Sequence, residues 1–257
     1  SVYASQRVPT TEIQLNSICN SIYISVFVLG LSAYAGVLTF FENERNMFYR
    51  HKAALMYDHK SLTIAAFWSE IPFILLVSMI FTVCFYFPLG FVAVASKFFY
   101  FYLFVTLNVA LWTFVGQMFI SLFRDAVTAQ GFGALFIGMT GLFTGNLIAP
   151  QNIPQVWIWA YWVFPLHYVI EGLLVSQYYG SNLQIEAIDG GSWYISLQCS
   201  PEEIGCYGTP YEYLLWRFGG FFTHGHLPYN VLYLFVFVTV TNIVKLIGLK
   251  RFNFLSK

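Results

Sequence analysis

Few side chains in this sequence have the chemistry of a catalytic group, and they lie far apart. Glu70 is the one carboxylate inside the long apolar stretches, within Ser69-Glu70-Ile71-Pro72. An ionisable residue at membrane depth is unfavourable. It marks either a functional site or a carboxylate bonded to neighbouring helices and to backbone groups freed by a proline. Both interpretations of Glu70 stay open, because no other apolar stretch offers a partner carboxylate.

The histidines do not form a recognisable metal or acid–base site. His167 has no cysteine or second histidine at ligand spacing, which favours a plain interfacial histidine. His224 and His226 are two residues apart, a spacing more typical of a solvated loop than of a metal site. The phosphate-binding pattern Gly-x-x-x-x-Gly-Lys does not occur. We therefore predict no metal site and no catalytic residue, and we expect that the chain alone is not an enzyme.

Composition places these residues in a membrane protein. The chain has 257 residues, of which 58% are hydrophobic and only 9% charged, and its mean hydropathy is +0.65. A soluble domain carries about 25% charged residues. Twelve basic residues balance twelve acidic ones, so no net charge attracts nucleic acid. The apolar residues form long unbroken blocks, which indicates membrane helices and not alternating barrel strands.

Five blocks are long enough to cross a bilayer, which takes about 20 apolar residues. They are residues 18–41, 62–87, 98–123, 126–148 and 229–249. The fourth block is rich in glycine, which lets helix backbones approach closely. The sequence thus predicts an all-α polytopic helical bundle. The odd number of spans after a polar start suggests that a further helix precedes this chain.

The positions of Lys and Arg predict the orientation, because such residues concentrate in cytoplasmic loops. With the first span running inward, nine of the twelve fall in residues 42–60, at Arg124, or in the tail from Lys245. We therefore predict that the chain starts outside the cell and ends in the cytosol.

The predicted topology makes residues 150–228 extracellular, and this segment is too long for a simple connection. Tryptophans and tyrosines around Pro154 and Pro165 favour a re-entrant or interfacial helix pair. Cys199 and Cys206 would lie on the oxidising side, which favours a disulfide over two free thiols.

The charged segment after the first span is unusual for a loop. One interpretation is a solvated turn. However, Phe48, Tyr49, Met56 and Tyr57 are large groups for an exposed loop that contacts nothing. Drawn as a helix, the segment places Glu44 and Phe48 along one edge, with neighbouring charged and aromatic residues beside it. Such a surface suits the docking of a partner domain.

At this segment the sequence resembles the transmembrane domain of ABC transporters of the G subfamily, of the pleiotropic drug resistance type. The matching residues are Glu44, Arg45, Phe48, Tyr49, Arg50, Ala53, Ala54, Met56 and Tyr57. Glu70-Ile71-Pro72, Gly141-Leu142-Phe143-Thr144-Gly145 and the ending Leu249-Lys250-Arg251-Phe252 match as well. The ordered motifs cover nearly the whole chain and resemble the second half of a full-length transporter. The stretch from Asn146 to Pro150 departs from the family pattern, which leaves the substrate open.

The resemblance implies an ABC-2 type transmembrane domain that contains helices two to six of its family. Residues 42–60 would couple it to a nucleotide-binding domain that is absent from this chain and that binds ATP and Mg²⁺. The implied coupling residues are Glu44, Arg45, Phe48, Tyr49 and Arg50. The implied function is ATP-driven export of hydrophobic compounds or lipids across the plasma membrane, with a second transmembrane domain as partner.

The resemblance also implies that the first and fourth spans line the substrate pathway. The expected lining residues are Leu29, Ser32, Ala33 and Gly36 on one span and Ile137, Gly138, Gly141 and Leu142 on the other. Asn146 and Leu147 match the position of an extracellular gate. Small apolar residues would select substrates by shape, although helix packing alone also explains them.

Two functions from other classes remain as alternatives. A membrane channel or scaffold fits the spans, but no span shows a repeated ring of polar residues suited to a filter. A lipid-modifying enzyme would need a reactive constellation. Glu70 and His167 do not supply one, because the topology places them near opposite faces of the membrane.

Overall fold

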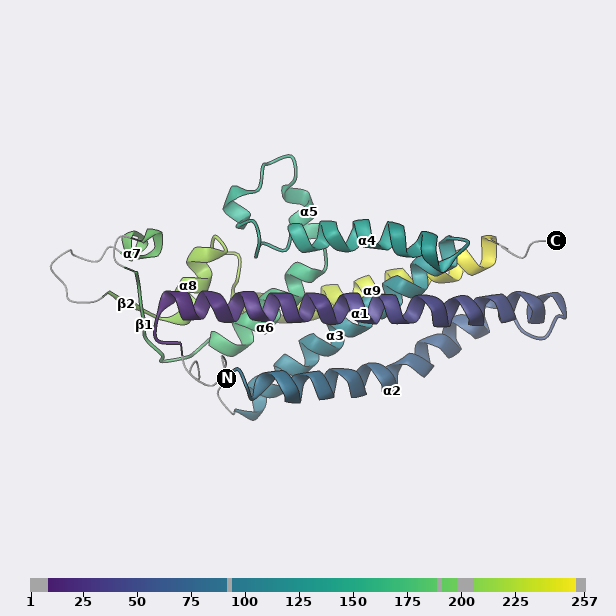
Figure 1. The fold of residues 1–257 in the computed structure, drawn as a ribbon, viewed down its shortest axis with the longest axis horizontal. Coiled ribbons are helices and arrows are strands. Elements are labelled where there is room, and N and C mark those ends of the chain that lie inside the picture. Colours follow the sequence, from purple (N-terminus) through teal and green to yellow (C-terminus); the bar gives the residue numbers. More distant parts are fainter. Residues whose placement is uncertain (1–8, 92–93, 189–190, 198–205, 253–257) are drawn as a thin grey trace.

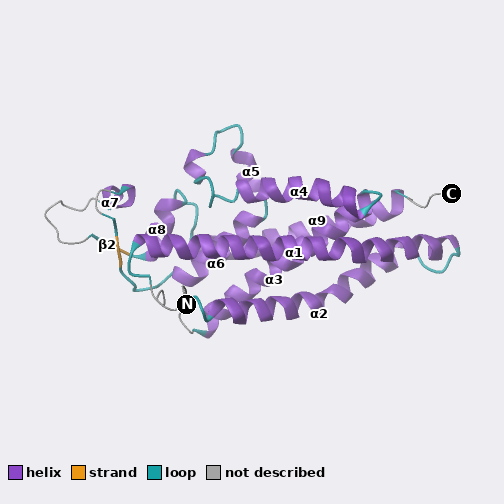
Figure 2. Cartoon of the chain, viewed as in Figure 1, coloured by secondary structure: helices purple, strands orange, loops and turns teal. Residues whose placement is uncertain are grey.

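The computed structural model describes residues 9–91, 94–188, 191–197 and 206–252, which form an elongated bundle of helices (Figure 1). In chain order the helices are α1 (Glu12–Ala53), α2 (His59–Tyr86), α3 (Ala95–Leu122), α4 (Ala126–Leu142), α5 (Ile158–Val163), α6 (Leu166–Tyr178), α7 (Ser192–Ser196), α8 (Pro210–Arg217) and α9 (Leu227–Arg251). Two short 3-10 helices, η1 (Pro150–Asn152) and η2 (His224–His226), and two strands, β1 (Ile185–Glu186) and β2 (Tyr207–Gly208), complete the described elements. Helix dominates throughout (Figure 2).

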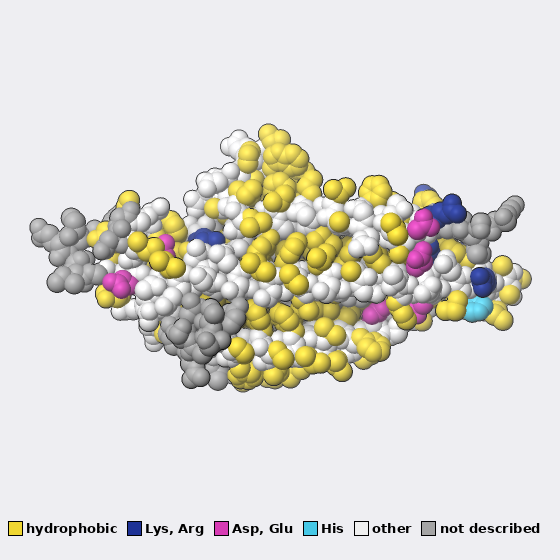
Figure 3. All heavy atoms as spheres, in the orientation of Figure 1, with side chains coloured by type: hydrophobic (Ala, Val, Ile, Leu, Met, Phe, Trp, Pro, Cys, Tyr) yellow, Lys and Arg dark blue, Asp and Glu magenta, His cyan; other side chains and the backbone are white. Residues whose placement is uncertain are grey.

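The two ends of the bundle differ in structure and charge. We call one the sheet end, where β1 pairs antiparallel with β2 beside α7 and α8. We call the other the basic end, where the α1–α2 connection, the α3–α4 turn and the end of α9 meet. Figure 3 shows Lys and Arg side chains gathered at the basic end, while hydrophobic side chains cover the middle of the visible face.

Among the described residues, four helices are long and apolar enough to cross a membrane: α1, α2, α3 and the stretch His224–Arg251 that contains α9. The fourth predicted span, residues 126–148, is shorter than expected. Helix α4 ends at Leu142 instead of residue 148 and has 17 residues, a length of about 25 Å. Gly145 follows with φ +89°, and Pro150 opens η1. Both residues disfavour continuation of the helix.

Helix α1 is longer than the predicted span. It has 42 residues, or about 63 Å at 1.5 Å per residue. The segment predicted as a separate cytosolic loop, residues 42–60, is mostly the last turns of this helix. The reason is local, since no glycine or proline occurs between Val37 and Ala53 to stop it. Residues 42–53 therefore continue the first span as one helix, and residues 54–58 connect it to α2.

The end of α1 is a tight turn with an unusual residue at its centre. The Met56 N–H donates to the His51 carbonyl at 3.0 Å, and the Leu55 N–H donates to the Lys52 carbonyl at 3.1 Å. This pair of bonds is a Schellman motif, whose C′ residue needs the left-handed conformation that glycine adopts most easily. Leu55 occupies that position with φ 56°.

Helix α3 is the centre of the bundle. In its most apolar window 61% of the residues are buried, against 17–33% for the other three long helices. Helices α1, α2, α6 and α9 all pack on it. The buried Asn108 side chain donates to the Val26 carbonyl of α1 at 3.1 Å and accepts a bond from the Trp112 indole at 3.1 Å. Polar groups inside α3 thus fasten it to its neighbours.

The segment between α4 and α9 packs onto the bundle instead of forming a free loop. Helices α5 and α6 lie where a helix pair is predicted, with Pro165 between them. Helix α6 is buried along nearly its whole length, and Gly172 lies where a side chain would overlap the Phe104 ring. Thr11 bridges Glu186, which joins the strand pair to the start of α1.

We predict that Gly133→Ala destabilises the α1–α4 contact. A methyl group at this position would overlap the ring of Tyr34, whose hydroxyl donates to the Ala129 carbonyl at 2.7 Å. We expect a loss of roughly 1–3 kcal/mol in the free energy of unfolding, measured by thermal unfolding in detergent. Gly131→Ala is the matched control, because a Cβ at Gly131 meets nothing within 4 Å. Equal melting temperatures of the two variants would contradict this account of the packing.

Candidate functional site

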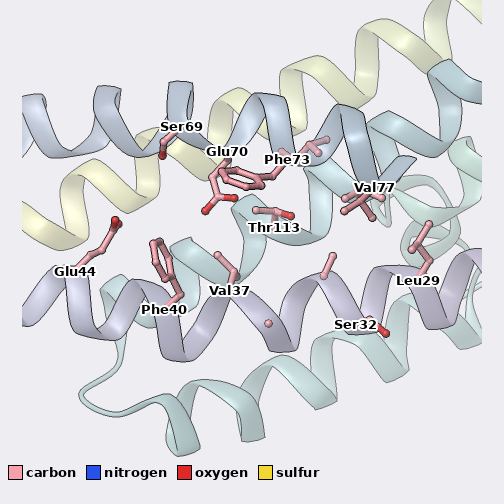
Figure 4. Close-up of a pocket in the computed structure, with 14 residues that line it drawn as sticks. Leu29, Ser32, Val37, Phe40, Glu44, Ser69, Glu70, Phe73, Val77 and Thr113 are labelled. Atoms are coloured by element: carbon pink, nitrogen blue, oxygen red, sulfur yellow. The ribbon is translucent and has the colours of Figure 1, made fainter. Parts of the chain in front are cut away.

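A cavity of about 520 Å³ lies between α1, α2 and α3 (Figure 4). This volume is within the range of roughly 300–1,000 Å³ of small-molecule sites. The lining residues are Leu29, Ser32, Ala33, Gly36, Val37, Phe40 and Glu44 of α1, Ser69, Glu70, Phe73, Ile74 and Val77 of α2, and Val109 and Thr113 of α3. The wall is mostly apolar, and the two carboxylates are the only charged groups among the described residues that line it.

The structure brings half of the predicted pathway residues into this cavity. All four on α1, namely Leu29, Ser32, Ala33 and Gly36, line it. The α4 residues lie elsewhere: Ile137 and Gly141 are buried, while Gly138 and Leu142 are exposed. The Gly141 carbonyl accepts a bond from the Tyr23 hydroxyl at 2.9 Å. Helix α4 therefore packs on a different face of α1, and the described α4 residues are not among those that line this cavity.

Sequence reasoning missed the α2 and α3 walls. Phe73, Ile74 and Val77 follow Glu70 by three, four and seven positions, the spacing of one helix face. That spacing would have placed them beside the carboxylate. Val109 and Thr113 carry no comparable signal, since nearly every position of α3 is apolar or buried.

Glu70 belongs to a hydrogen-bonded chain that crosses three helices. Its Oε1 accepts a bond from Gln117 Nε2 at 3.0 Å, and Gln117 Oε1 accepts one from Lys245 Nζ at 2.7 Å. Lys245 is 0% exposed, and its ammonium lies 5.5–5.7 Å from the centroids of the Phe114 and Phe41 rings. The prediction that Lys245 belongs to a cytosolic tail was wrong, because this amide and these rings hold it inside the bundle.

Two charged residues of α1 fasten the turn between α3 and α4. The Arg45 guanidinium donates to the carbonyls of Ile120, Phe123 and Arg124. Glu42 Oε1 accepts a bond from the Ala126 N–H at 3.3 Å. The carbonyl end of a helix attracts a cation and the amide end an anion. Helix α1 therefore supplies a cation to the carbonyl end of α3 and an anion to the amide end of α4. We call these contacts of Arg45 and Glu42 the turn clasp.

The turn clasp changes the role of several predicted coupling residues. Arg45, Phe48 and Tyr49 are 1%, 0% and 2% exposed, and the Tyr49 hydroxyl donates to the Phe252 carbonyl at 2.9 Å. The structure thus places these three inside the chain: Arg45 binds the end of α3, Tyr49 binds the residue after α9, and the Phe48 ring packs against Tyr49 and Tyr57. Glu44 is half-buried in the cavity wall, and Arg50 is exposed.

Large apolar side chains are exposed at the basic end, but they do not belong to the predicted coupling residues. Leu55 is 93% exposed, Met56 70% and Met47 53%. We call these three residues the apolar tip. Sequence reasoning noted Met56 but not Leu55, since only the structure shows that Leu55 projects from a left-handed turn.

The predicted gate residues lie near the sheet end. Asn146 is buried; its Nδ2 donates to Asn20 Oδ1 at 3.1 Å, and its carbonyl accepts a bond from Arg217 at 3.4 Å. Leu147 is 60% exposed. Both residues line a second cavity, of about 410 Å³. Of the predicted disulfide, Cys199 lies outside the described residues, and Cys206 is 2% exposed.

His167 is more deeply enclosed than an interfacial histidine. It is 1% exposed and lies 3.7 Å from the Glu171 carboxylate, a residue that sequence reasoning did not consider. Burial lowers the pKa of His167 to about 3. Burial raises the pKa of Glu171, an effect that the neighbouring Asn230 and His226 side chains oppose. In the described part of the chain, no group of three or more His, Cys, Asp or Glu residues is placed to hold a metal ion.

We predict that Arg45 stabilises the fold and that Arg45→Ala lowers the free energy of unfolding by roughly 2–4 kcal/mol, because buried carbonyls lose charged donors. Arg45→Lys keeps the charge but not the planar fork, so an intermediate loss is expected. The exposed Arg50→Ala is the control and should change stability by less than about 0.5 kcal/mol. Chemical unfolding in detergent measures all three. A similar loss of unfolding free energy in the Arg50 variant would contradict the proposed stabilising role of Arg45 in the turn clasp.

We predict that His167 makes the fold sensitive to acid. Its pKa is lower in the folded state, so its contribution to stability is complete above about pH 6.5 and is lost as the pH falls toward 3. Glu171 acts oppositely, since its raised pKa favours the folded state below about pH 4.5 and that contribution is lost at higher pH.

The test compares melting temperatures from pH 7 to 4.5. His167→Phe should reduce the loss on acidification by on the order of 2 kcal/mol, whereas Glu171→Gln should leave the full His167 loss in place. An unchanged pH dependence in His167→Phe would exclude this role.

Sequence comparison agrees with these features. The profile of the family described as ABC-2 type transporter matches residues 1–178. ABC transporter G family member 36 of Arabidopsis thaliana is 31% identical over 176 residues, which are 68% of this chain and 12% of that protein. Member 42 of Oryza sativa subsp. japonica is 33% identical over 178 residues, 69% of this chain and 12% of that protein. Member 48 of the same plant is 27% identical over 228 residues, 89% of this chain and 15% of that protein.

These relatives are much longer than the chain, which spans 12–15% of their length. The family profile covers 178 of the 257 residues of this chain. Its long apolar helices have the dimensions of membrane spans. The chain therefore belongs to the ABC-2 type transporter family, as an integral membrane domain related to plant ABC transporters of the G family.

Proposed function

We propose that this chain is the substrate-translocating domain of an ATP-driven exporter in the plasma membrane. Its cargo would be hydrophobic or amphipathic compounds, including lipids. Its partners would be a nucleotide-binding domain, which binds ATP and Mg²⁺ outside this chain, and a second transmembrane domain. The observation that carries the proposal is that one continuous helix, α1, forms a wall of the cavity and ends at the turn that bears Leu55 and Met56 of the apolar tip.

The charge distribution supports placing the basic end in the cytosol. Lys and Arg gather there in Figure 3, as expected of cytoplasmic segments. The sheet end, with Asn146 and Leu147, would then lie outside, where a gate for release is needed. A disulfide between Cys199 and Cys206 would be stable on that side.

The apolar tip offers a contact for the nucleotide-binding domain. Exposed large apolar groups on a charged end typically mark a protein interface. Leu55 also adopts a left-handed conformation that is unfavourable by roughly 1–2 kcal/mol for a residue with a side chain. A leucine retained in a strained and exposed position is readily explained by a partner that covers it.

The turn clasp would transmit a push on the apolar tip. Helix α1 extends without a break from the tip to the sheet end. Arg45 and Glu42 tie it to the end of α3 and the start of α4. Movement of the tip would therefore move these helices together and reshape the cavity between α1, α2 and α3. In this scheme Glu44, Arg45, Phe48 and Tyr49 support coupling from within, and the exposed contact is made by the tip, with Arg50 exposed on the last turn of α1.

We predict that Leu55→Asn uncouples transport without unfolding the domain. Asparagine tolerates the left-handed conformation, so the melting temperature should not fall, while the apolar contact is lost. In inside-out vesicles that contain the complete parent transporter, ATP-driven accumulation of Nile red should decrease at least about threefold, since removing one buried leucine contact costs about 1–3 kcal/mol.

Leu55→Met keeps an apolar side chain and is the matched control, with transport close to the starting rate. Full transport by Leu55→Asn would exclude the tip as the coupling contact. Failure of the unsubstituted transporter to accumulate any hydrophobic dye with ATP would overturn the proposed function.

A further inference from the structure

We propose that the cavity between α1, α2 and α3 binds amphiphiles that carry one positive charge, with the charge placed between Glu44 and Glu70. This inference rests on the proposed function, because it specifies the substrate class of the same domain. The carboxylates point into the space between α1 and α2 in Figure 4, and no other charged residue of the described ranges lines the cavity.

The rest of the cavity suits an apolar body. Leu29 and Val37 of α1 lie across the cavity from Phe73 and Val77 of α2 in Figure 4, and Ala33 also lines it. Gly36 leaves the wall open, since a Cβ at this position would meet nothing within 4 Å. An occupant of the size of a drug molecule therefore finds one polar end and a long apolar remainder.

The charges around the cavity do not balance. Lys245 is a buried cation that reaches Gln117 at 2.7 Å and is not among the residues that line the cavity. Gln117 separates this ammonium from Glu70, to which it donates at 3.0 Å. Arg45 is directed to the carbonyls at the end of α3. When both carboxylates are ionised, Lys245 matches one of the two negative charges, and no described residue of the cavity wall supplies a positive charge for the other.

An uncompensated charge in a medium of low polarity is unfavourable, and a bound cation relieves it. A bound monocation restores neutrality, because the two negative charges of the glutamates are then balanced by the positive charge of Lys245 and that of the ligand. An anionic amphiphile would face two carboxylates and be repelled. The geometry therefore favours amines and quaternary cations with a hydrophobic body over fatty acids and other anions.

The glutamates keep their packing when the charge is removed. Glu70→Gln is isosteric and still offers an oxygen to Gln117. Glu44 has no hydrogen bond from another residue in the described part of the structure that Gln would break. Asp125→Asn is the matched control, because it also converts an acid to an amide at the basic end. Asp125 is 58% exposed in its side chain and lies outside the cavity.

The experiment measures equilibrium binding of two probes to the purified complete transporter without ATP. Tetraphenylphosphonium is the cationic probe and Nile red the neutral one. We expect that Glu70→Gln and Glu44→Gln each weaken tetraphenylphosphonium binding by about tenfold and change Nile red binding by less than twofold. Asp125→Asn should change neither affinity. Gly36→Leu, which fills the cavity, should weaken both.

Tetraphenylphosphonium affinities within twofold of the starting protein in both glutamate variants would overturn the proposal. An equal loss of Nile red binding in these variants would also overturn it, because the acids would then shape the cavity and not select charge. So would unaltered binding of both probes to Gly36→Leu, since another helix or lipid would then fill the space.

This test is independent of the proposed function. ATP-driven accumulation of Nile red together with normal cation binding by the glutamate variants would support the proposed export function and overturn the proposal that the glutamates select charge. Weaker cation binding in the glutamate variants without any ATP-driven accumulation would support the proposed cation site and overturn the proposed export function.

Discussion

The structure depends on hydrogen bonds that the buried polar groups of α3 make with the surrounding helices. In a lipid environment neighbouring helices gain little from the hydrophobic effect, so close packing and polar contacts decide which helices associate. Asn108 binds a carbonyl of α1, and Gln117 joins Glu70 of α2 to Lys245 of α9. Each amide is satisfied only when the correct helix lies beside it, since an unpaired polar group there is strongly unfavourable. These two positions help to fix the arrangement of α1, α2 and α9 around α3.

The same requirement explains the charges at the basic end. The last carbonyls of α3 and the first amides of α4 have no partners within their own helices, and the short turn between the helices cannot satisfy them. Arg45 and Glu42, less than one turn apart on α1, supply a cation and an anion to the matching helix ends. This contact needs α1 to continue as a helix past the apolar span. The length of α1 and the closure of the α3–α4 turn are thus one feature, which also joins the apolar tip mechanically to the cavity.

Much of the fold could be predicted from the sequence, and the site only in part. Residues 62–87 and 98–123 are close to the bounds of α2 and α3, because long apolar blocks leave helix as the favourable state in a bilayer. Helix α1 exceeded its predicted end because hydropathy marks where apolar residues stop, not where the helix stops. Leu29 and Gly36, which were predicted as pathway residues, line a cavity whose opposite wall within this chain is α2. Arg45, Phe48 and Tyr49 were expected at a partner interface, because large and charged residues in a polar segment look exposed until the helix that covers them is known.

The sequence by itself determined that this protein lies in a membrane and that it is helical, since composition and block length follow from the solvent that surrounds the chain. It also determined the family, through ordered local motifs. Only the tertiary structure decided which face of each helix is buried, that Lys245 and Arg45 lie inside, and that two carboxylates share one end of an apolar cavity. The reason is that all faces of these helices are apolar, so periodicity carries almost no information about the contacts. Those contacts depend on where a few glycines, amides and charges meet across helices that are far apart in the chain.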